Sequence, residues 1–431
     1  MDYIITPDKT KEIKGIINIP PSKSHTLRSI LFASLAKGNS IIKYYLENSP
    51  DTIAMINACR ALGAKIEILE NSTLNIIGVA GNPKVPKDII NAGNSGQVLR
   101  FILGVAALNS GYTVITGDDS IRSLRSVLPL IDGLTQLGAF CVSTKSDGYA
   151  PVIVKGPLKP GKVIIDGEDS QSVSAILIAS ALVPGITKIR VKNPGERPWV
   201  NLTLDWLKKF GISFINKDFV DYTVHGTTNY EGFNYKVPGD FSSALFPIIA
   251  AIIKKSSITL TNIHMDDVQG DKAVISILQD MGINIVNDKT QNLLHINKGQ
   301  VIKAININVN DFIDSITILA VLACYAKETS HITGAAIAQH KECNRLQAIS
   351  TELNKMGGNV KVTEDGLIIK PSSLKGSVVN SYNDHRVAMS LAIAALGAEG
   401  KTIIKNTDCV AKTFPNFVEE FKHIGVDITV S

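Results

Sequence analysis

A short helix-ending signature recurs six times along the 431 residues, and this repeat restricts the possible folds more than any other feature of the chain. In each copy a glycine follows a helix-favouring stretch and precedes a β-rich run. A glycine that ends a helix in the left-handed conformation explains this pattern. The six glycines lie 68 to 75 residues apart and are Gly63, Gly138, Gly211, Gly282, Gly357 and Gly425. The sequence therefore predicts six copies of one structural unit.

A second element precedes each glycine by about 40 residues. It is a small polar cluster followed by an apolar, alanine-rich helix, at residues 22–36, 94–108, 170–183, 240–253, 312–326 and 383–397. These helices are apolar on most faces, which predicts that they are buried. Ser, Asn, Asp or Gly at their starts are residues that cap helix N-termini. Strand-like runs follow at 113–117, 188–193, 257–262, 330–334 and 402–406.

Units with helices buried on nearly every face need neighbours around them, which favours two domains of three units each. The segment YKVPGD at residues 235–240 is the predicted crossover, because Pro238 and Gly239 interrupt regular structure. IPPSK near residue 20 is a second crossover if the N-terminal strand belongs with the last three units. We therefore expect one domain at residues 21–237 and a second at residues 1–20 and 238–431.

Composition excludes several classes of protein. The chain is 45% hydrophobic and carries a formal net charge of +5 with dispersed Lys and Arg, which gives no case for nucleic-acid binding but suits small anionic substrates. No apolar run approaches 18 residues and the N-terminus has no apolar signal region, so we expect a cytoplasmic protein without membrane contact. Five widely spaced cysteines predict buried, reduced thiols rather than a zinc site.

The polar helix starts suggest anion binding, because a helix N-terminus presents free N–H groups and the positive end of the helix dipole. Helix capping alone explains the polar residues of any single helix start. Three of the helix starts, however, carry charged residues that capping does not require. They are Lys23 with Arg28, Asn94 with Gly96 and Arg100, and Asp384 with His385 and Arg386. Further cations lie at Arg122, Arg125, Lys341, Arg345 and Lys412, and Asp314 and Glu342 are candidate carboxylates for proton transfer.

These motifs resemble those of the 5-enolpyruvylshikimate-3-phosphate synthase family over the full length. PSKSxTxR, NSGxxxR, SQ, GDxSSA, QGD, KExxR, NDHR and AKTFP occur in the family's order and spacing. The resemblance implies an α/β fold with two inside-out α/β barrel domains, six βαβαββ repeats, three in each domain, and buried helices. It also implies an active site in the interdomain cleft, with the shikimate 3-phosphate side on residues 21–237.

The implied reaction transfers the enolpyruvyl group of phosphoenolpyruvate to the 5-hydroxyl of shikimate 3-phosphate and releases phosphate. The resemblance implies that this reaction serves aromatic amino acid biosynthesis and that the enzyme is the target of glyphosate. The resemblance implies no metal or organic cofactor, these two small-molecule substrates as the partners, no nucleic acid, no membrane, and a monomer.

The resemblance also implies roles for particular residues. Asp314 accepts the hydroxyl proton and Glu342 is the acid, with Lys23, His385 and Lys412 as further catalytic residues. The expected shikimate 3-phosphate site comprises Lys23, Ser24, Arg28, Ser170, Gln171, Arg197, Asp314 and Lys341. The expected phosphoenolpyruvate site comprises Lys23, Asn94, Gly96, Arg125, Gln171, Arg345, Arg386 and Lys412.

Several positions depart from the family pattern. Asp169 and Glu196 stand where serines usually bind the substrate phosphate, and Arg197 is the candidate to bind that phosphate by a direct ion pair. Ile337, Gln339, Asn344 and Ser126 also differ. Two alternatives stay open: the sister transferase that acts on UDP-N-acetylglucosamine, and a non-catalytic ligand-binding relic of the same fold. Against the first, the chain has Lys23-Ser24 instead of Lys-Asn and lacks a cysteine at 117–126.

Overall fold

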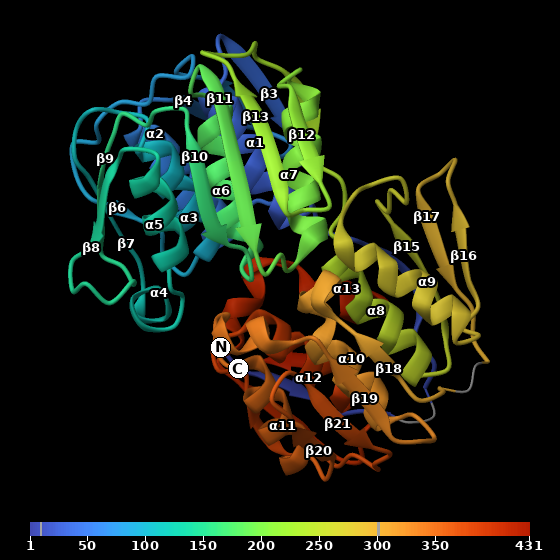
Figure 1. Ribbon diagram of the computed structural model, residues 1–431. Coiled ribbons are helices and arrows are strands. Elements are labelled where there is room, and N and C mark those ends of the chain that lie inside the picture. The colour runs from blue at the N-terminus through green and yellow to red at the C-terminus, as the bar shows by residue number, and fades with distance from the viewer. Residues whose placement is uncertain (9–10, 300–301) are drawn as a thin grey trace. The chain divides into compact units, whose positions relative to one another are not determined.

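The computed structural model describes residues 1–8, 11–299 and 302–431. The chain divides into two compact units (Figure 1). The N-terminal unit is Pro21–Val237, and the C-terminal unit is Met1–Pro20 together with Pro238–Ser431. Within the described ranges, each unit contains three four-stranded sheets.

The N-terminal unit runs through α1 (Lys23–Leu35), β3 (Asn39–Lys43), α2 (Pro50–Ala61), β4 (Lys65–Leu69), β5 (Thr73–Ile77), β6 (Ile90–Asn91), α3 (Gly96–Ala106), β7 (Thr113–Thr116), α4 (Asp119–Ser123), α5 (Leu128–Gln136), β8 (Phe140–Ser143), β9 (Val152–Lys155), β10 (Lys162–Asp166), α6 (Ser170–Ala181), β11 (Gly185–Lys192), α7 (Arg197–Lys209), β12 (Phe214–Lys217), β13 (Asp221–Gly226) and β14 (Asn234–Lys236).

The C-terminal unit contains β1 (Tyr3–Ile5), β2 (Lys14–Asn18), α8 (Phe241–Ile253), β15 (Ser257–Thr261), η1 (Gly270–Lys272), α9 (Ala273–Asp280), β16 (Ile285–Asp288), β17 (Leu293–Ile296), β18 (Asn306–Asn308), η2 (Asn310–Ser315), α10 (Ile316–Cys324), β19 (Ser330–Thr333), η3 (Ala336–His340), α11 (Arg345–Lys355), β20 (Asn359–Val362), β21 (Leu367–Lys370), β22 (Val378–Asn380), α12 (His385–Gly397), β23 (Thr402–Lys405), η4 (Thr407–Lys412), α13 (Phe417–His423) and β24 (Ile428–Val430).

The predicted βαβαββ repeat is confirmed, and β6 to β9 show it in continuous form. β6 and β7 are parallel and are connected through α3, and β7 then pairs antiparallel with β9, which pairs with β8. The sheet order is therefore β6-β7-β9-β8, and β10 to β13 and β18 to β21 repeat it. The five strand-like runs anticipated from the sequence coincide with β7, β11, β15, β19 and β23.

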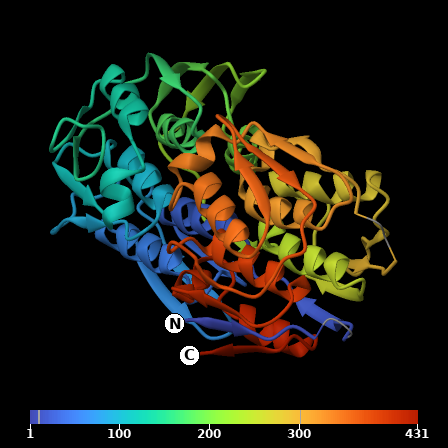
Figure 2. The same cartoon turned by 90° about the horizontal axis from the view of Figure 1, so that it is seen from below.

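Three of the sheets borrow a strand from a distant part of the chain. β14 pairs parallel with β3, so the end of the third repeat completes the first. β2 pairs parallel with β15, and β1 lies between β23 and β24. β1 and β2 therefore complete two sheets of the C-terminal unit, and the two chain ends lie side by side (Figure 2).

Six helices form the interiors of the two units, as the apolar segments predict. They are α1, α3 and α6 in the N-terminal unit and α8, α10 and α12 in the C-terminal unit, and nearly all their side chains are buried. Side-chain caps start five of them, at Ser22, Ser95, Asp169, Asp240 and Asp384. α10 instead continues from the 3-10 turn η2 and has no side-chain cap. The polar helix starts are therefore held in fixed positions by buried elements.

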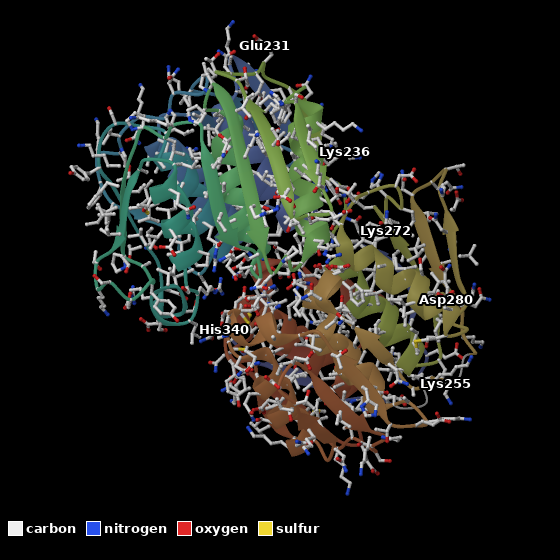
Figure 3. All side chains as sticks on the ribbon, viewed as in Figure 1. Glu231, Lys236, Lys255, Lys272, Asp280 and His340 are labelled. Carbon is white, nitrogen blue, oxygen red and sulfur yellow. The ribbon has the colours of Figure 1, made fainter. Side chains whose placement is uncertain are left out.

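The other main helices end at the six repeating glycines. Each of these glycines has a positive φ, between 68° and 105°, which confirms the left-handed helix ends. Strands alternate buried and exposed residues, as in the pattern of β11. Charged side chains are spread over the exposed faces of both units (Figure 3).

None of the helices in the described part of the chain has the length and hydropathy needed to cross a membrane. The five cysteines are free thiols, but the expectation that all are buried is wrong for two. Cys59, Cys141 and Cys324 are buried, whereas Cys343 and Cys409 are only partly buried, with their thiols near Asp384 and Ser381 respectively.

Candidate active site

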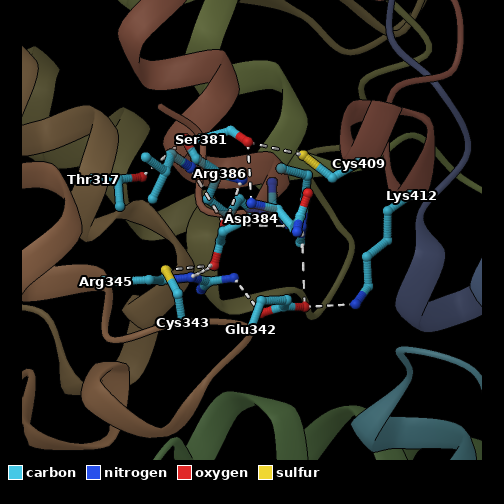
Figure 4. Close-up of polar contacts among 12 residues, drawn as sticks. Thr317, Glu342, Cys343, Arg345, Ser381, Asp384, Arg386, Cys409 and Lys412 are labelled. Atoms are coloured by element: carbon cyan, nitrogen blue, oxygen red, sulfur yellow. Dashed lines mark hydrogen bonds and ion pairs between the residues drawn. The ribbon is translucent and has the colours of Figure 1, made fainter. Parts of the chain in front are cut away.

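Arg345, the first residue of α11, is the centre of a buried charge cluster in the C-terminal unit (Figure 4). Its Nε donates to Asp384 Oδ2 at 2.7 Å, its Nη1 to Asp314 Oδ1 at 2.7 Å, and its Nη2 to Glu342 Oε2 at 2.8 Å. The Arg345 side chain is only 2% exposed. One guanidinium therefore fixes three carboxylates, which come from η2, from the loop before α11 and from the start of α12.

The charge of Arg345 is stabilised by these partners. Burial alone lowers the pKa of an arginine, but the carboxylates of Asp384, Glu342 and Asp314 outweigh it and hold the pKa of Arg345 well above its usual range. Arg345 is therefore a permanent cation.

Glu342 is held by cations at both of its oxygens. Oε2 accepts from Arg345, and Oε1 accepts from Lys412 Nζ at 2.6 Å. The side chains of Lys412 and Glu342 are 5% and 7% exposed. His385 Nδ1 lies 4.0 Å from the same Oε1. These contacts place the predicted acid, Glu342, next to two more residues of the predicted catalytic set.

Asp384 connects this cluster to the helix interior. Its Oδ1 caps α12 by accepting from the backbone N–H of Arg386 at 2.8 Å and of Val387 at 3.3 Å. Its other oxygen binds Arg345. A single capping residue thus anchors a helix start and a buried arginine together.

Arg386 is buried in the first turn of α12 and is only partly satisfied. Its Nη2 donates to Asp314 Oδ2 at 3.2 Å. Its Nε and Nη1 are buried and have no hydrogen-bond partner among residues 1–8, 11–299 and 302–431. Since a buried cationic donor without an acceptor is costly, these N–H groups indicate a position for an anionic ligand.

Asp271 also belongs to this region, although sequence reasoning assigned it no role. It is fully buried in η1, and it accepts hydrogen bonds from Ser242 Oγ at 2.8 Å and from Ser315 Oγ at 2.5 Å. Burial, and after it the charge of Asp314, raises the pKa of Asp271 to about 7. The QGD motif was the available signal, but only the fold shows that it approaches Asp314.

A second group of predicted residues lies at the start of α3 in the N-terminal unit. Arg125 Nη1 donates to the carbonyl oxygen of Asn94 at 3.1 Å, and its Nη2 to Asn94 Oδ1 at 3.3 Å. Asn94 Nδ2 in turn donates to Ser120 Oγ at 3.0 Å and to Asp118. The loop around α4 thereby holds Arg125 against the N-terminus of α3.

Gly96 allows three polar side chains to gather at this helix start. A Cβ atom at Gly96 would lie 2.8 Å from Arg100 Nη1, 3.2 Å from Arg125 Nη1 and 3.3 Å from Gln171 Oε1. The absence of a side chain is therefore what permits Arg100, Arg125 and Gln171 to share the space.

Arg100 was noted in the sequence as a charge without an assigned role, and it is central here. Its Nη2 lies 2.7 Å from Asp169 Oδ2 and donates to the carbonyl oxygen of Ser126 at 2.8 Å. Its Nη1 donates to Gln171 Oε1 at 3.4 Å. Burial lowers the pKa of Arg100, whereas the charge of Asp169 opposes this shift. Arg100 thus links the starts of α3 and α6.

Asp169, the first departure from the family pattern, caps a helix and pairs with a buried arginine. Its Oδ1 caps α6 by accepting from the backbone N–H of Gln171 at 2.9 Å, and its Oδ2 pairs with Arg100. The carboxylate is therefore paired and does not repel an incoming anion as strongly as an isolated one would.

The second departure, Glu196, sits on the start of α6 as well. Its Oε2 accepts from the backbone N–H of Ser170 at 3.1 Å and from Ser170 Oγ at 2.9 Å. Glu196 is 2% exposed and has left-handed backbone angles, φ 46° and ψ 40°. The predicted phosphate donor Ser170 thus already binds a carboxylate.

The residues of the PSKSxTxR motif, Lys23, Ser24 and Arg28, lie in the first turns of α1. Lys23 Nζ is 3.6 Å from Asp51 Oδ2, and Ser24 is partly buried. Arg28 is buried and bonds within its own unit: Nε and Nη2 donate to Thr203 Oγ1 at 3.1 and 3.0 Å, and Nη2 also donates to the Trp199 carbonyl at 3.2 Å.

Arg28 is therefore largely committed to the start of α7. Its Nη1 donates to the Ser24 carbonyl, and its guanidinium lies 5.0 Å from the centroid of the Phe101 ring. Burial lowers the pKa of Arg28 to about 9. By contrast, Arg197 at the first position of α7 is exposed, and Lys341 next to η3 is partly buried.

Glu342, Asp384 and His385 offer ligand atoms within 4.8 Å of one another, which is a spacing that a metal ion can use. The carboxylates of this trio are however hydrogen-bonded to Arg345, Lys412 and the start of α12. A dication would compete with two fixed cations, so the donor set fits a metal poorly.

Comparison with known proteins agrees with this arrangement. The family described as EPSP synthase (3-phosphoshikimate 1-carboxyvinyltransferase) matches residues 7–421. Relatives named 3-phosphoshikimate 1-carboxyvinyltransferase include one from Acetivibrio thermocellus, 43% identical over 98% of this chain and 98% of its own length. One from Chlamydia caviae is 43% identical over 99% of this chain and 94% of its own.

Solved structures show the same fold. An EPSP synthase from Acinetobacter baumannii superposes with a TM-score of 0.84 at 30% identity, covering 100% of this chain and 99% of that one. The enolpyruvyl transferase NikO from Streptomyces tendae has a TM-score of 0.79 at 18% identity, over 99% and 98% of the chains, which supports the fold alone. The chain belongs to the family of the EPSP synthases, the 3-phosphoshikimate 1-carboxyvinyltransferases.

Proposed function

We propose that this chain transfers the enolpyruvyl group of phosphoenolpyruvate to the 5-hydroxyl of shikimate 3-phosphate, a step of the shikimate pathway to the aromatic amino acids. The hydroxyl oxygen bonds to C2 of phosphoenolpyruvate while C3 gains a proton. The tetrahedral intermediate then loses a C3 proton and its phosphate, which restores the double bond. Full-length relatives with this activity in their names support the proposal.

The observation that carries the proposal is the unsatisfied cationic surface of Arg386. Its Nε and Nη1 are buried without a partner in the described residues, while Arg345 and Lys412 lie in the same cluster. Such fixed donors suit a carboxylate or phosphate, and they stabilise charge that develops as phosphate leaves. We therefore assign Arg345, Arg386 and Lys412 to phosphoenolpyruvate.

Asp314 and Glu342 are the proposed proton carriers. Asp314 has one oxygen on Arg345 and the other on Arg386, so its orientation is fixed by two cations. Glu342 lies between Arg345 and Lys412, with His385 beside it. We propose that Asp314 accepts the hydroxyl proton and that Glu342 supplies the proton to C3.

The N-terminal unit supplies the remaining proposed ligands. For phosphoenolpyruvate these are Lys23, Asn94, Gly96, Arg125 and Gln171. For shikimate 3-phosphate they are Lys23, Ser24, Arg28, Ser170, Gln171 and Arg197, with Lys341 and Asp314 from the C-terminal unit. That both groups serve one active site stays a prediction, as do the monomeric state and the cytoplasmic location.

Phosphate release with both substrates tests the proposal. We expect release only when phosphoenolpyruvate and shikimate 3-phosphate are both present, and a rise of about tenfold or more in KM for phosphoenolpyruvate in Arg386→Met. Arg190→Met is the matched control, because Arg190 is exposed and forms an ion pair with Asp221 in the same sheet. A folded wild-type protein that releases no phosphate would refute the proposal.

Two further arms test the alternatives. UDP-N-acetylglucosamine in place of shikimate 3-phosphate should give no phosphate release, and release would favour the sister transferase. We propose that no metal takes part, so dialysis against a chelator should leave the rate unchanged. A rate that falls and recovers with added dication would contradict this.

A further inference from the structure

The start of α6 already carries an anion that belongs to the protein. Glu196 Oε2 accepts from both the backbone N–H and the hydroxyl of Ser170, the first residue of the helix. These are the donors that a phosphate or carboxylate uses at a helix N-terminus. Glu196 thus occupies the position where an anionic ligand would bind.

The backbone holds Glu196 in this place. Gly195 donates its N–H to the Gly167 carbonyl at 2.9 Å, and a Cβ at Gly195 would lie 2.7 Å from the Glu168 carbonyl oxygen. The loop before α7 is therefore pressed against the loop before α6. Glu196 itself adopts left-handed angles, which are unfavourable for a residue with a side chain.

The Glu196 side chain does not serve its own helix. It stands at the N-cap position of α7 and makes no capping hydrogen bond there. Its carboxylate instead reaches across to α6. A glutamate in a strained conformation that serves a neighbouring helix start is explained by a role at that start, and not by the stability of α7.

A buried cation, Arg100, also lies at the start of α6. Its charge suits a further anion at this helix start. Arg100 is 4% exposed, pairs with Asp169 at the α6 cap, and feels the charge of Glu196. Its Nε is buried without a hydrogen-bond partner in the described part of the chain. An unused charged donor next to the α6 start is independent evidence for a ligand there.

We infer that Glu196 is a specificity-determining residue: its carboxylate occupies the Ser170 anion position, and the phosphate group of shikimate 3-phosphate binds only by displacing it. This inference rests on the proposed function. Ser170 can donate to Glu196 or to the phosphate but not to both, so the cost of moving Glu196 weakens substrate binding. Phosphoenolpyruvate, assigned to other residues, bears no such cost.

Neutral replacements of Glu196 test the inference. In Glu196→Gln we expect the KM for shikimate 3-phosphate to fall about tenfold, since a charged hydrogen-bond partner no longer competes for Ser170. The KM for phosphoenolpyruvate should change by less than about twofold, because this substrate is assigned to other residues. Glu196→Asn is a second variant, because asparagine tolerates left-handed backbone angles and so preserves the loop.

Glu168→Gln is the matched control. Glu168 is exposed two residues before Ser170, and its replacement makes the same charge change. Titration calorimetry of shikimate 3-phosphate into each variant, without phosphoenolpyruvate, gives the same comparison without turnover. An unchanged or higher KM in both Glu196 variants, or an equal fall in Glu168→Gln, would overturn the inference. Wild-type turnover judges the proposed function separately, since it is measured without any variant.

Discussion

The starts of α12 and α6 share one arrangement, a capping aspartate that also binds a buried arginine, but in different surroundings. In α12, Asp384 caps the helix with Oδ1 and binds Arg345 with Oδ2. In α6, Asp169 caps the helix with Oδ1 and binds Arg100 with Oδ2. Each aspartate thus connects a buried helix start to a buried arginine. Asp169, although it departs from the family pattern, therefore has the same structural role as Asp384.

The two starts differ in what surrounds the shared arrangement. Arg345 holds two more carboxylates, Asp314 and Glu342, which are the proposed proton carriers. The start of α6 instead carries the carboxylate of Glu196 on its donors. The difference agrees with the two proposed roles: proton transfer at the C-terminal cluster, and selection of an anion at the start of α6.

The largest expected effect is on Asp314. We predict that Asp314→Asn lowers kcat by about 10²- to 10⁴-fold, because the proposed proton acceptor is lost. Asp311→Asn is the control, since Asp311 is exposed in the same turn η2. Circular dichroism should show that both variants fold. A near-wild-type rate in Asp314→Asn would break the comparison, since the C-terminal cluster would then not carry the chemistry.

Loss of the buried arginines compares the two helix starts directly. Arg345→Met leaves three carboxylates around an apolar side chain, and we predict a loss of about 3–5 kcal/mol of unfolding free energy. Arg100→Met removes the ion pair with one carboxylate, Asp169, which is 19% exposed, and should cost about 1–3 kcal/mol. Urea unfolding measures both. Equal losses would mean that the extra carboxylates of the C-terminal cluster do not depend on Arg345.

Gly96 tests how tightly the N-terminal group is assembled. In Gly96→Ala the new Cβ meets Arg100 Nη1 at 2.8 Å and Arg125 Nη1 at 3.2 Å, so both arginines must move. We predict a rise of about tenfold in KM for phosphoenolpyruvate. Gly161→Ala is the control, because its nearest neighbour would be Leu137 at 3.7 Å. A KM that stays at the wild-type value would show that Arg125 does not bind this substrate in the observed position.

The last prediction is a pH dependence of stability. Burial raises the pKa of Asp271 from 3.8 to about 7, with Asp314 raising it further and Ser315, Arg386 and Ser242 opposing the shift. A raised carboxyl pKa means that the folded state binds the proton more tightly than the unfolded state. The stabilisation is complete below about pH 4 and is lost as pH rises toward about 7.

Thermal unfolding of Asp271→Asn checks this sign. The wild-type Tm should fall relative to the variant between about pH 4 and about pH 7, because only the wild type loses a proton at this position. Parallel curves for wild type and Asp271→Asn would show that Asp271 does not titrate there.

The sequence could predict the repeating unit and most of the residues that gather at the helix starts. A helix cap needs only neighbouring residues, as at Asp384, and a left-handed helix end needs only its glycine, as at Gly138. The family motifs identified Asp314, Glu342 and Lys412 as site residues, and the fold brings these three residues into one cluster. Local rules were therefore sufficient for the helix caps and helix ends, and the family resemblance for these site residues.

Tertiary structure decided the rest, because it depends on elements that are remote in sequence. The packing of α3 against α6 brings Arg100 to Asp169, and the approach of η1 to η2 brings Asp271 to Ser315. Strands β1, β2 and β14 complete sheets whose other strands lie far along the chain. The charge of Asp169 was readable in the sequence, but whether it stood alone or paired depended on which helix packs beside it.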